Sequence, residues 1–389
     1  MPEGKFVTSK IQKLARFAFF LSFLLLALLT DGCFPKQKQE EYITIGALLP
    51  LTGESSDEGL RAANALYIAK EEINANGGVL GKKLDIIVLN DRGDEDYIVE
   101  QYNVLKRKGI AAIIGSSYSD VTIALAKASE KDGIPVISPS ASNPGVTKGR
   151  KNVFRAIFID EYQAEAMASF AYNSLNAKTA VVMSNKNSDG LRQISDVFIK
   201  FFEKYGGQIT AIEIYSEEND FKSILKKYET NPPDIIFCPE DYVPAAKLVN
   251  AVYESGIKNM FILGTDAWDG ILTYVYHPDA MKNVYYTSPF SFDDDDPAVA
   301  QFTQNYFDSF SQIPLSGSAT AYTCVYILSE AIKKAGNTNW DDIISAMKVN
   351  ETDVITGHIK YDENNNPRTN VYIIQIKGGV YSVYKKINM

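Results

Sequence analysis

The stretch Ile-Thr-Ile-Gly-Ala-Leu-Leu-Pro, residues 43–50, is a short apolar run that ends at a proline. Such a run is typical of a strand buried on both faces of a sheet. A helical stripe follows it, with apolar residues at spacings of four, three and four: Ala62, Leu66, Ala69 and Ile73. Gly77 and Gly78 end that helix, because glycine tolerates the left-handed C-cap conformation. Residues 43–78 therefore predict a strand followed by a helix that packs on it.

The same alternation continues along the chain. We expect strands at 84–89, 111–115 and 134–138 and helices at 96–108 and 121–131. It restarts with a helix at 163–175, and further strands are expected at 179–183, 208–214, 234–238 and 260–263, separated by helices at 191–205, 221–228 and 244–255. Strands that alternate with amphipathic helices indicate parallel sheets. The predicted fold class is α/β, with two Rossmann-like lobes that have parallel central sheets and are joined by a hinge.

The tail of the chain is expected to serve both lobes. From residue 285 it holds another strand, helices at 298–310 and 319–335, and a closing pair of strands around 359–361 and 371–376. We assign residues 42–160 and 288–358 to lobe 1, and residues 161–287 and 359–389 to lobe 2. The acidic run 293–296 is interpreted as the loop before a helix, where the helix dipole favours acids, because it lacks the spacing of a calcium loop.

Composition narrows the function classes. The chain has 389 residues and a net charge of −9, without a basic stripe, so nucleic acid is a poor candidate partner. It has two histidines and three cysteines, too few for the common zinc sites. We expect no metal and no cofactor. Cys238 and Cys324 lie in apolar segments, where a disulfide and two buried free thiols are both open alternatives.

The first 32 residues have the character of a secretory signal. Basic residues precede an apolar run at 17–29 that is too short to span a bilayer. Gly32-Cys33 resembles the end of a lipobox, which makes Cys33 the candidate lipidation site, although Thr30 and Asp31 depart from the usual pattern. A plain signal peptide with an incidental cysteine is the alternative. Residues 33–41 are interpreted as a tether, and the protein is expected in the periplasm or at the cell surface, anchored to a membrane by lipid.

Polar loops follow the predicted strands where a ligand would bind. In open parallel sheets, ligands bind beyond the carboxyl ends of the strands. Ser119 follows the third strand, and Ser140, Ala141 and Ser142 follow the fourth, so hydroxyls and backbone N–H groups gather at one edge and suit a carboxylate. Ser119 is equally compatible with a helix N-cap. In lobe 2, Asp266 follows the strand at 260–263, where it either pairs with an ammonium or caps a helix.

Several motifs resemble the branched-chain amino-acid-binding (Leu/Ile/Val-binding) family of type I periplasmic substrate-binding proteins. They are IGALLPLTG at 45–53, EEINANGGVLGKK at 71–83, IPVISPSA at 134–141, FR at 154–155 and SATAY at 318–322. The likeness runs from about Tyr42 to the C-terminus. It implies an extracytoplasmic binding protein that closes around a small amino acid or a related polar molecule and delivers it to an ABC permease in the membrane.

The resemblance also implies ligand-binding residues. Ser119 and Ser142 match positions that hold the amino and carboxylate groups, with the backbone of Ser140 and Ala141 beside them, and Asp266 matches the acid that receives the ammonium. Further positions implied by the family pattern are Asp160, Tyr162, Tyr242 and Tyr322. Asn187 stands where the family often has an aromatic residue, so the sequence departs from the pattern of branched-chain specificity there.

Two rival functions remain at this point. A ligand-sensing receptor subunit would share the binding site and differ only in its output. A secreted hydrolase would need a nucleophile elbow or a Ser/His/Asp arrangement, but the chain has no G-x-S-x-G motif and both histidines, His277 and His358, lie in late segments. We therefore expect a binding protein that is not an enzyme.

Overall fold

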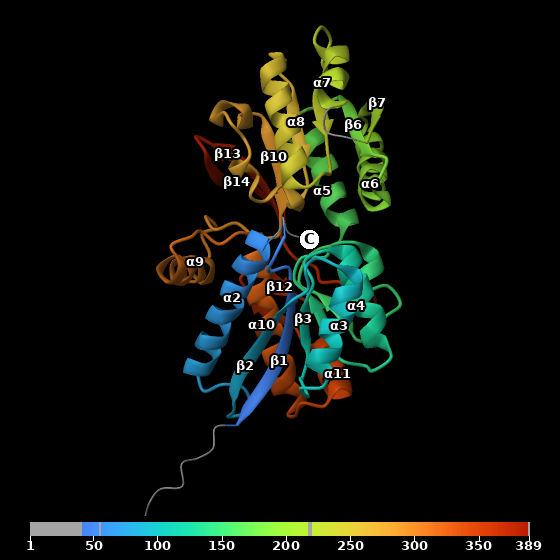
Figure 1. Ribbon diagram of the computed structural model, residues 1–389. Coiled ribbons are helices and arrows are strands. Elements are labelled where there is room, and N and C mark those ends of the chain that lie inside the picture. The colour runs from blue at the N-terminus through green and yellow to red at the C-terminus, as the bar shows by residue number, and fades with distance from the viewer. Residues whose placement is uncertain (1–40, 54–55, 217–219, 388–389) are drawn as a thin grey trace, which may run out of the picture. The chain divides into compact units, whose positions relative to one another are not determined.

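The computed structural model describes residues 41–53, 56–216 and 220–387. Lobe 1 is built on a parallel sheet with strand order β2-β1-β3-β4-β5. Its strands are β1 (Tyr42–Leu49), β2 (Lys83–Asn90), β3 (Ile113–Gly115), β4 (Val136–Ser138) and β5 (Val153–Arg155). The short β5 was not anticipated from the sequence. Figure 1 shows β2, β1 and β3 side by side in this sheet. The predicted N-terminal signal and the candidate lipidation site Cys33 lie outside the described residues.

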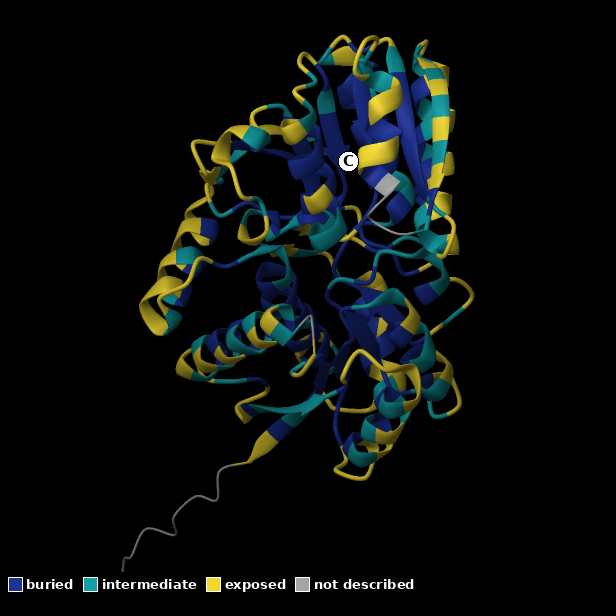
Figure 2. Ribbon diagram, turned by 45° about the horizontal axis from the view of Figure 1, so that its top comes forward, coloured by how far each residue is buried: buried dark blue, intermediate teal, exposed yellow. Residues whose placement is uncertain are grey.

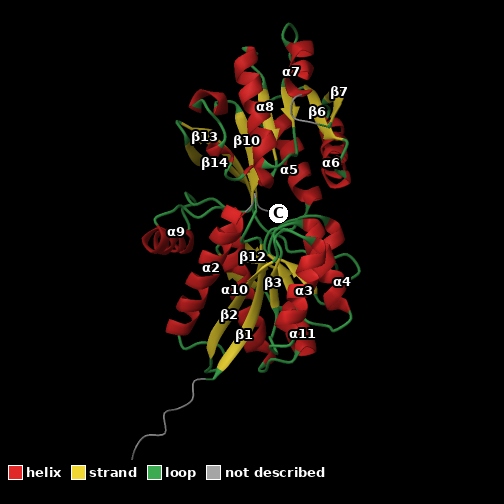
Figure 3. Cartoon of the chain, viewed as in Figure 1, coloured by secondary structure: helices red, strands yellow, loops and turns green. Residues whose placement is uncertain are grey.

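Helices cover both faces of this sheet (Figure 3). One face carries a core shared by α2 (Ser56–Ala75), α9 (Pro297–Phe310), α10 (Ser316–Ala335) and α11 (Trp340–Val349). The other face packs against α3 (Glu95–Lys106) and α4 (Ser119–Glu130). The apolar stripe of α2 predicted from the sequence faces that first core, since Ala62, Leu66 and Ala69 are buried there. Helix α11 was missed by the sequence analysis.

Lobe 2 has a second sheet with strand order β14-β13-β10-β9-β8-β6-β7. Its parallel part consists of β6 (Thr179–Asn185), β7 (Gln208–Tyr215), β8 (Ile235–Phe237), β9 (Phe261–Gly264) and β10 (Val284–Ser288). Helices α5 (Asp160–Asn173) and α6 (Asp189–Tyr205) share one core, and α7 (Asp220–Leu225) and α8 (Tyr242–Ser255) share the other. Figure 2 shows the inner strands of this sheet buried and the outer helix faces exposed, whereas the edge strand β7 has exposed residues at every second position.

The closing strands differ from the prediction. β13 (Val371–Lys377) pairs antiparallel with β10 and with β14 (Val380–Ile387), so it joins lobe 2. β12 (Gly357–Ile359) pairs instead with β11 (Thr352–Val354) in a separate two-stranded sheet. The predicted pairing of 359–361 with 371–376 was therefore wrong. The sequence shows strand-forming runs, but it does not show which sheet each run joins.

The acidic run 293–296 has structural partners. Asp296 caps α9 by accepting from the N–H of Ala298 (2.8 Å). Asp294 accepts hydrogen bonds from Tyr372 Oη (2.7 Å) and Lys386 Nζ (2.8 Å). These bonds join the segment before α9 to β13 and β14, in agreement with the interpretation of this run as a helix-start loop.

Candidate functional site

The loops after β3 and β4 are bonded to each other. Ser138 Oγ donates to the carbonyl of Ser116 (2.9 Å) and accepts from the N–H of Ala141 (3.1 Å). Gly115 has φ +144°, and a Cβ there would lie 2.4 Å from the carbonyl oxygen of Leu48, so only glycine fits at the turn out of β3. These contacts fix both loops at the carboxyl edge of the sheet.

Ser119 is tied to the same loop pair. Its Oγ accepts from the N–H of Asn143 (3.3 Å). The N-cap position of α4 is Tyr118, and no side chain caps that helix. Ser119 is therefore not the N-cap of α4, and its hydroxyl instead forms a hydrogen bond with the backbone of the loop after β4.

Arg155, the last residue of β5, binds the backbone of the loop that follows β4. Its guanidinium is fully buried and donates to the carbonyls of Ala141 (2.8 Å) and Asn143 (2.8 Å). Burial lowers its pKa to about 10, although the nearby Asp160 and Glu161 carboxylates oppose the shift. It remains charged at neutral pH and orients the backbone of residues 141–143.

A hydrogen-bonded path leads from this loop to lobe 2. The carbonyl of Ser142 accepts from the N–H of Asp160 (3.2 Å), the first residue of α5. Gln163 Nε2 donates to Asp160 Oδ1 (3.1 Å), and Gln163 Oε1 accepts from the N–H of Asp266 (3.1 Å). Thr287 Oγ1 donates to the same Gln163 oxygen (2.7 Å). Ser142, Asp160 and Asp266, which the sequence analysis placed in one site, therefore belong to one network.

Asp266 sits on a turn shaped by a tryptophan. A Cβ on Gly264 would lie 2.2 Å from the Trp268 ring, so glycine lets the fully buried indole pack against the end of β9. Asp266 begins the short 3-10 helix Asp266–Trp268, whose N-cap is Thr265, and no side chain caps it. Burial, then Asp160, raises the pKa of the half-buried Asp266 carboxyl to about 7. An ammonium beside it would restore the ionised form.

Further carboxylates that the sequence analysis did not select lie at this edge. Burial, then Asp241 and Asp269, raises the pKa of Glu58 on the first turn of α2 to about 7. Burial, then Glu240, raises the pKa of Asp241 to about 6. Asp269 Oδ2 accepts from the N–H of Ser316 (2.6 Å), a bond between lobe 2 and the start of α10. Glu240 and Asp241 come two and three residues after the end of the predicted strand 234–238, a signal that could have identified them.

The remaining sequence candidates are spread over several environments. Tyr242 is half-buried at the start of α8, with its ring 5.7 Å from that of Tyr274. Asn187 is exposed and donates to the carbonyl of Ser216 (3.2 Å). Tyr162 packs against a small cluster that includes Phe158.

Tyr322 does not join the network. It lies on α10 and is nine-tenths buried; its hydroxyl donates to Glu72 Oε2 on α2, and its ring packs on Phe302 of α9. The late aromatic motif is therefore part of the lobe 1 core in this structure, and we do not carry Tyr322 forward as a ligand contact. The motif gave its position in the chain but not the direction of the side chain.

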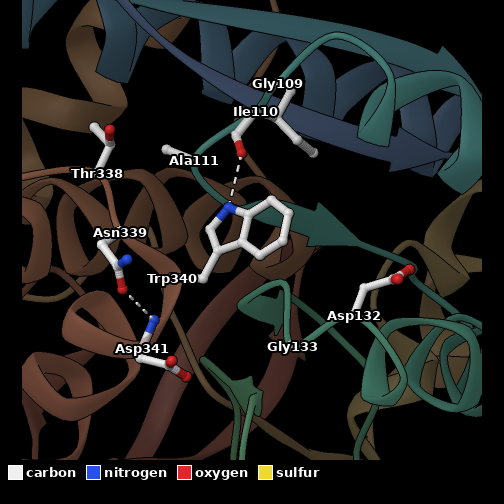
Figure 4. Close-up of a pocket in the computed structure, with 9 residues that line it drawn as sticks. All are labelled: Gly109, Ile110, Ala111, Asp132, Gly133, Thr338, Asn339, Trp340 and Asp341. Atoms are coloured by element: carbon white, nitrogen blue, oxygen red, sulfur yellow. Dashed lines mark hydrogen bonds between the residues drawn. The ribbon is translucent and has the colours of Figure 1, made fainter.

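A recess of about 380 Å³ lies at the opposite edge of lobe 1 (Figure 4). It is lined by residues before β3 and β4 and by the start of α11, where Trp340 Nε1 donates to the carbonyl of Ile110 (3.0 Å). Parallel sheets bind ligands at the carboxyl ends of their strands, so this recess is on the wrong edge for the network described above.

The sequence matches the model of the periplasmic binding protein family over residues 42–380. The chain belongs to that family. Among curated relatives, a leucine-, isoleucine-, valine-, threonine- and alanine-binding protein of Pseudomonas aeruginosa is 26% identical over 348 residues, covering 88% of this chain and 92% of the relative. A Leu/Ile/Val-binding protein homolog of Brucella suis is 24% identical over 337 residues, covering 85% of this chain and 89% of the relative.

Solved structures agree with this periplasmic binding protein fold. A leucine-binding protein of Thermotoga maritima superposes with a TM-score of 0.80 at 26% identity, covering 89% of this chain and 99% of its own. A branched-chain amino-acid substrate-binding protein of Streptococcus pneumoniae, in complex with isoleucine, also gives 0.80 at 26% identity, covering 90% and 99%. The α/β fold with two lobes and parallel-dominated sheets is confirmed, and the chain has a solute-binding role.

The relatives and the structure also bear on the location of this periplasmic binding protein, on membrane spans and metal sites, and on its cysteines. Its relatives are binding proteins of transporters, and the family implies an extracytoplasmic location. Within the described ranges, no helix is long and apolar enough to cross a bilayer, and no group of His, Cys, Asp and Glu is arranged to hold a metal ion. Cys238 and Cys324 are both buried free thiols, which decides between the two alternatives left by the sequence.

Proposed function

We propose that this protein captures a small amino acid between its two lobes and delivers it to an ABC permease. The observation that carries the proposal is the path Ser142–Asp160–Gln163–Asp266, which links the backbone of the β4 loop in lobe 1 to the backbone of the turn that bears the Asp266 carboxylate in lobe 2. An amino acid has an anionic end that suits the first and a cationic end that suits the second.

In the proposed complex, the ligand carboxylate lies at the loops after β3 and β4. Ser119 and Ser142 offer hydroxyls there, and Ser140 and Ala141 offer backbone next to them. The ammonium lies at Asp266, with Asp160 nearby. Each charge-assisted hydrogen bond contributes about 1.5–3 kcal/mol, so a few of them suffice for micromolar affinity, about −8 kcal/mol.

Hinge motion is the proposed means of capture. The chain passes between the two sheets between β5 and α5, between β10 and α9, and between β12 and β13. Rotation about these segments would bring the loops after β3 and β4 of lobe 1 and the Asp266 turn of lobe 2 together around the ligand. We further propose that Cys33 carries lipid that keeps the protein at the membrane, where the permease lies, and that the protein catalyses no reaction.

A ligand panel tests the proposal. The thermal midpoint of the purified protein is measured with each of the common amino acids and with simple organic acids and amides. At least one amino acid should raise the midpoint by several degrees, and Asp266→Ala should abolish that shift because the ammonium loses its partner. Asp279→Ala, at an exposed position of lobe 2, is the matched control. Undiminished binding by the Asp266 variant would remove the ammonium assignment, and no response to any amino acid would refute the proposed function.

A further inference from the structure

Strand β7 is an edge of the lobe 2 sheet and exposes apolar side chains. The strand order ends at β7, and β6 is its strand neighbour in the described part of the chain (Figure 1). Ile212 and Ile214 of β7 are 52% and 68% exposed. The backbone N–H and C=O groups on the outer side of an edge strand have no partner in their own sheet, so they are available to a strand of another chain.

The two isoleucines share one face of the sheet. Glu213, which lies between them, accepts a hydrogen bond from Lys227 Nζ (2.7 Å) in the segment after α7, so it points to the face that α7 covers. Because side chains alternate along a strand, Ile212 and Ile214 point to the opposite face, which α6 covers. Both remain more than half exposed there, so α6 does not shield them.

The other edges of the two large sheets are protected against pairing. β14, at the opposite edge of the same sheet, carries exposed Lys385 and Lys386, and lysines on an edge strand oppose the approach of another strand. Of its eight residues, β2 exposes Lys83 alone, and β5 is three buried residues long. β7 contains no lysine or proline, and although a bulge at Thr210 bends its start, the rest of the strand pairs regularly with β6. The protein therefore leaves this one long edge open.

The charges around β7 suit an identical partner. The chain has a net charge of −9, so two copies repel each other over most of their surfaces. In β7 itself, Glu213 is the one charged residue, and Lys227 pairs with it. The neighbouring helix α6 exposes charges of both signs, on Arg192, Asp196, Lys200 and Glu203. Two copies of this surface therefore meet without net repulsion, whereas a strongly charged partner would find no complementary charge.

The sequence of β7 is also compatible with pairing to itself. A two-fold axis perpendicular to the sheet would align two β7 edges antiparallel and keep the α6 face of both copies on the same side. With Ile212 on the axis, each Ile212 faces its own copy and Ile214 faces Thr210, which are favourable cross-strand pairs of β-branched residues. On the other face, Glu213 then lies opposite Ala211. A pair centred on Glu213 would instead place two carboxylates opposite each other, so the register around Ile212 is favoured.

We propose that β7 pairs with the β7 of a second copy of this chain, which joins two seven-stranded sheets into one continuous sheet in a two-fold dimer. This symmetric pairing leaves neither β7 edge open. The interface uses lobe 2 alone, so lobe 1 of each copy stays free to move about the hinge. The inference goes beyond the proposed function and does not depend on it, because β7 contributes no residue to the path from Ser142 to Asp266.

Sedimentation velocity of the purified protein over a dilution series tests the dimer. Ile212→Lys and Ile214→Lys should each raise the dissociation constant of the dimer at least ~10-fold, because a symmetric interface loses the buried isoleucine twice and gains two like charges. Val380→Lys, at an exposed apolar position of the opposite edge strand β14, is the matched control and should leave the constant unchanged. Both β7 variants should keep the circular dichroism spectrum of the unmodified protein, which shows that the dimer and not the fold is lost.

Disulfide trapping tests the register. Directly opposite residues of an antiparallel pair have Cα atoms about 4.5–5.5 Å apart, which is within the range that a disulfide spans. Mild oxidation should therefore link the Ile212→Cys variant to its own copy. Gln208→Cys, at an exposed position of the same strand, should not form this link, because its two copies would lie ~20 Å or more apart. The unmodified protein, which keeps its own three cysteines, is the blank.

Each outcome supports or overturns the inference. A protein that is monomeric at every concentration would overturn it and leave the β7 edge to a strand of another protein. A dimer that both lysine variants leave unchanged would overturn it as well, because its interface would lie elsewhere. A dimer that the lysine variants weaken, but that Ile212→Cys does not cross-link, would overturn the register around Ile212. These outcomes leave ligand capture untouched, since the amino-acid panel decides that separately.

Discussion

Gln163 Nε2 donates a 3.1 Å hydrogen bond to Asp160 Oδ1, and the other end of the same amide accepts from the backbone N–H of Asp266. Both carboxylate residues are thereby positioned by one buried side chain on the first turn of α5. Since α5 is the first element after the chain leaves β5, this amide lies where lobe 1 connects to lobe 2.

Replacing this amide should loosen the site. Gln163→Ala removes the partners of Asp160 and of the Asp266 turn, so we expect amino-acid affinity to fall ~10-fold and the free energy of unfolding to fall by about 1–3 kcal/mol. Calorimetric titration and chemical denaturation measure the two effects. Gln193→Ala, at an exposed position of α6, should leave both values unchanged, and an equal loss there would rule out a specific role for Gln163.

The affinity should depend on pH. The pKa values of Glu58 and Asp266 are raised to about 7 and that of Asp241 to about 6, first by burial in each case. Protonation removes the charges that a cationic ligand needs, so affinity should fall as pH decreases from 8 to 5. The decrease should approach about tenfold per pH unit for each carboxylate that must ionise.

The free protein should show the opposite trend. A carboxyl with a raised pKa is destabilising when ionised, so the unliganded protein should gain stability as pH falls from 8 toward 5. The groups that face Glu58 are Asp241, Asp269, Asp91 and Ser117. Glu58→Gln should flatten both profiles, and thermal melts across this pH range check it. Profiles identical to those of the unmodified protein would show that Glu58 does not titrate there.

Arg155 should matter through the loop that it holds. Arg155→Lys keeps the charge but cannot donate to the carbonyls of Ala141 and Asn143 in the same planar geometry. We expect a loss of about 1–3 kcal/mol in unfolding free energy and weaker amino-acid binding. Arg368→Lys, at an exposed position, is the control. If Arg155→Lys lost stability but bound normally, the loop backbone would not contact the ligand.

Asp294 should contribute stability that depends on pH. Burial alone would raise its pKa, but the hydrogen bonds from Lys386 and Tyr372 outweigh burial and lower it. Its contribution is therefore present above the ordinary carboxyl pKa, about 4, and is lost as pH falls below that value. Asp294→Asn should cost about 1–3 kcal/mol at neutral pH, measured by denaturation. Asp295→Asn, the exposed neighbour, should cost nothing measurable.

Lipid attachment at Cys33 has a direct test. Metabolic labelling with a radioactive fatty acid should mark the protein, and Cys33→Ser should remove the label and release the protein from the membrane fraction. Cys238→Ser should keep the label, because that thiol is buried and free. Membrane retention and labelling of the Cys33 variant would refute the lipid anchor.

The sequence predicted most of the fold because the strands and helices of both lobes have strong periodic patterns. β13 was assigned to a wrong partner, because its pairing with β10 depends on contacts far apart in the chain. Of the site, the loops at the strand ends were predictable, and the structure brings Ser142, Asp160 and Asp266 into one network. The direction of a side chain was not predictable in the case of Tyr322, because its motif does not reveal that its hydroxyl donates to Glu72.

Other site residues gave little signal in the sequence. Glu58 lies in a polar stretch before the apolar stripe of α2, where an acid is ordinary helix-start chemistry. Its place in the site depends on lobe 2, which supplies Asp241 and Asp269 from positions about 180–210 residues later. A single sequence does not contain that proximity.

Because β13 and β14 complete the sheet that begins with β6, each lobe takes segments from widely separated parts of the chain. During synthesis, the edge of β10 that pairs with β13 stays unpaired until β13 emerges. A nonsense mutation before β13 would thus leave an open sheet edge prone to aggregation. Cutting the chain at a single point would not release either lobe as a complete folded fragment.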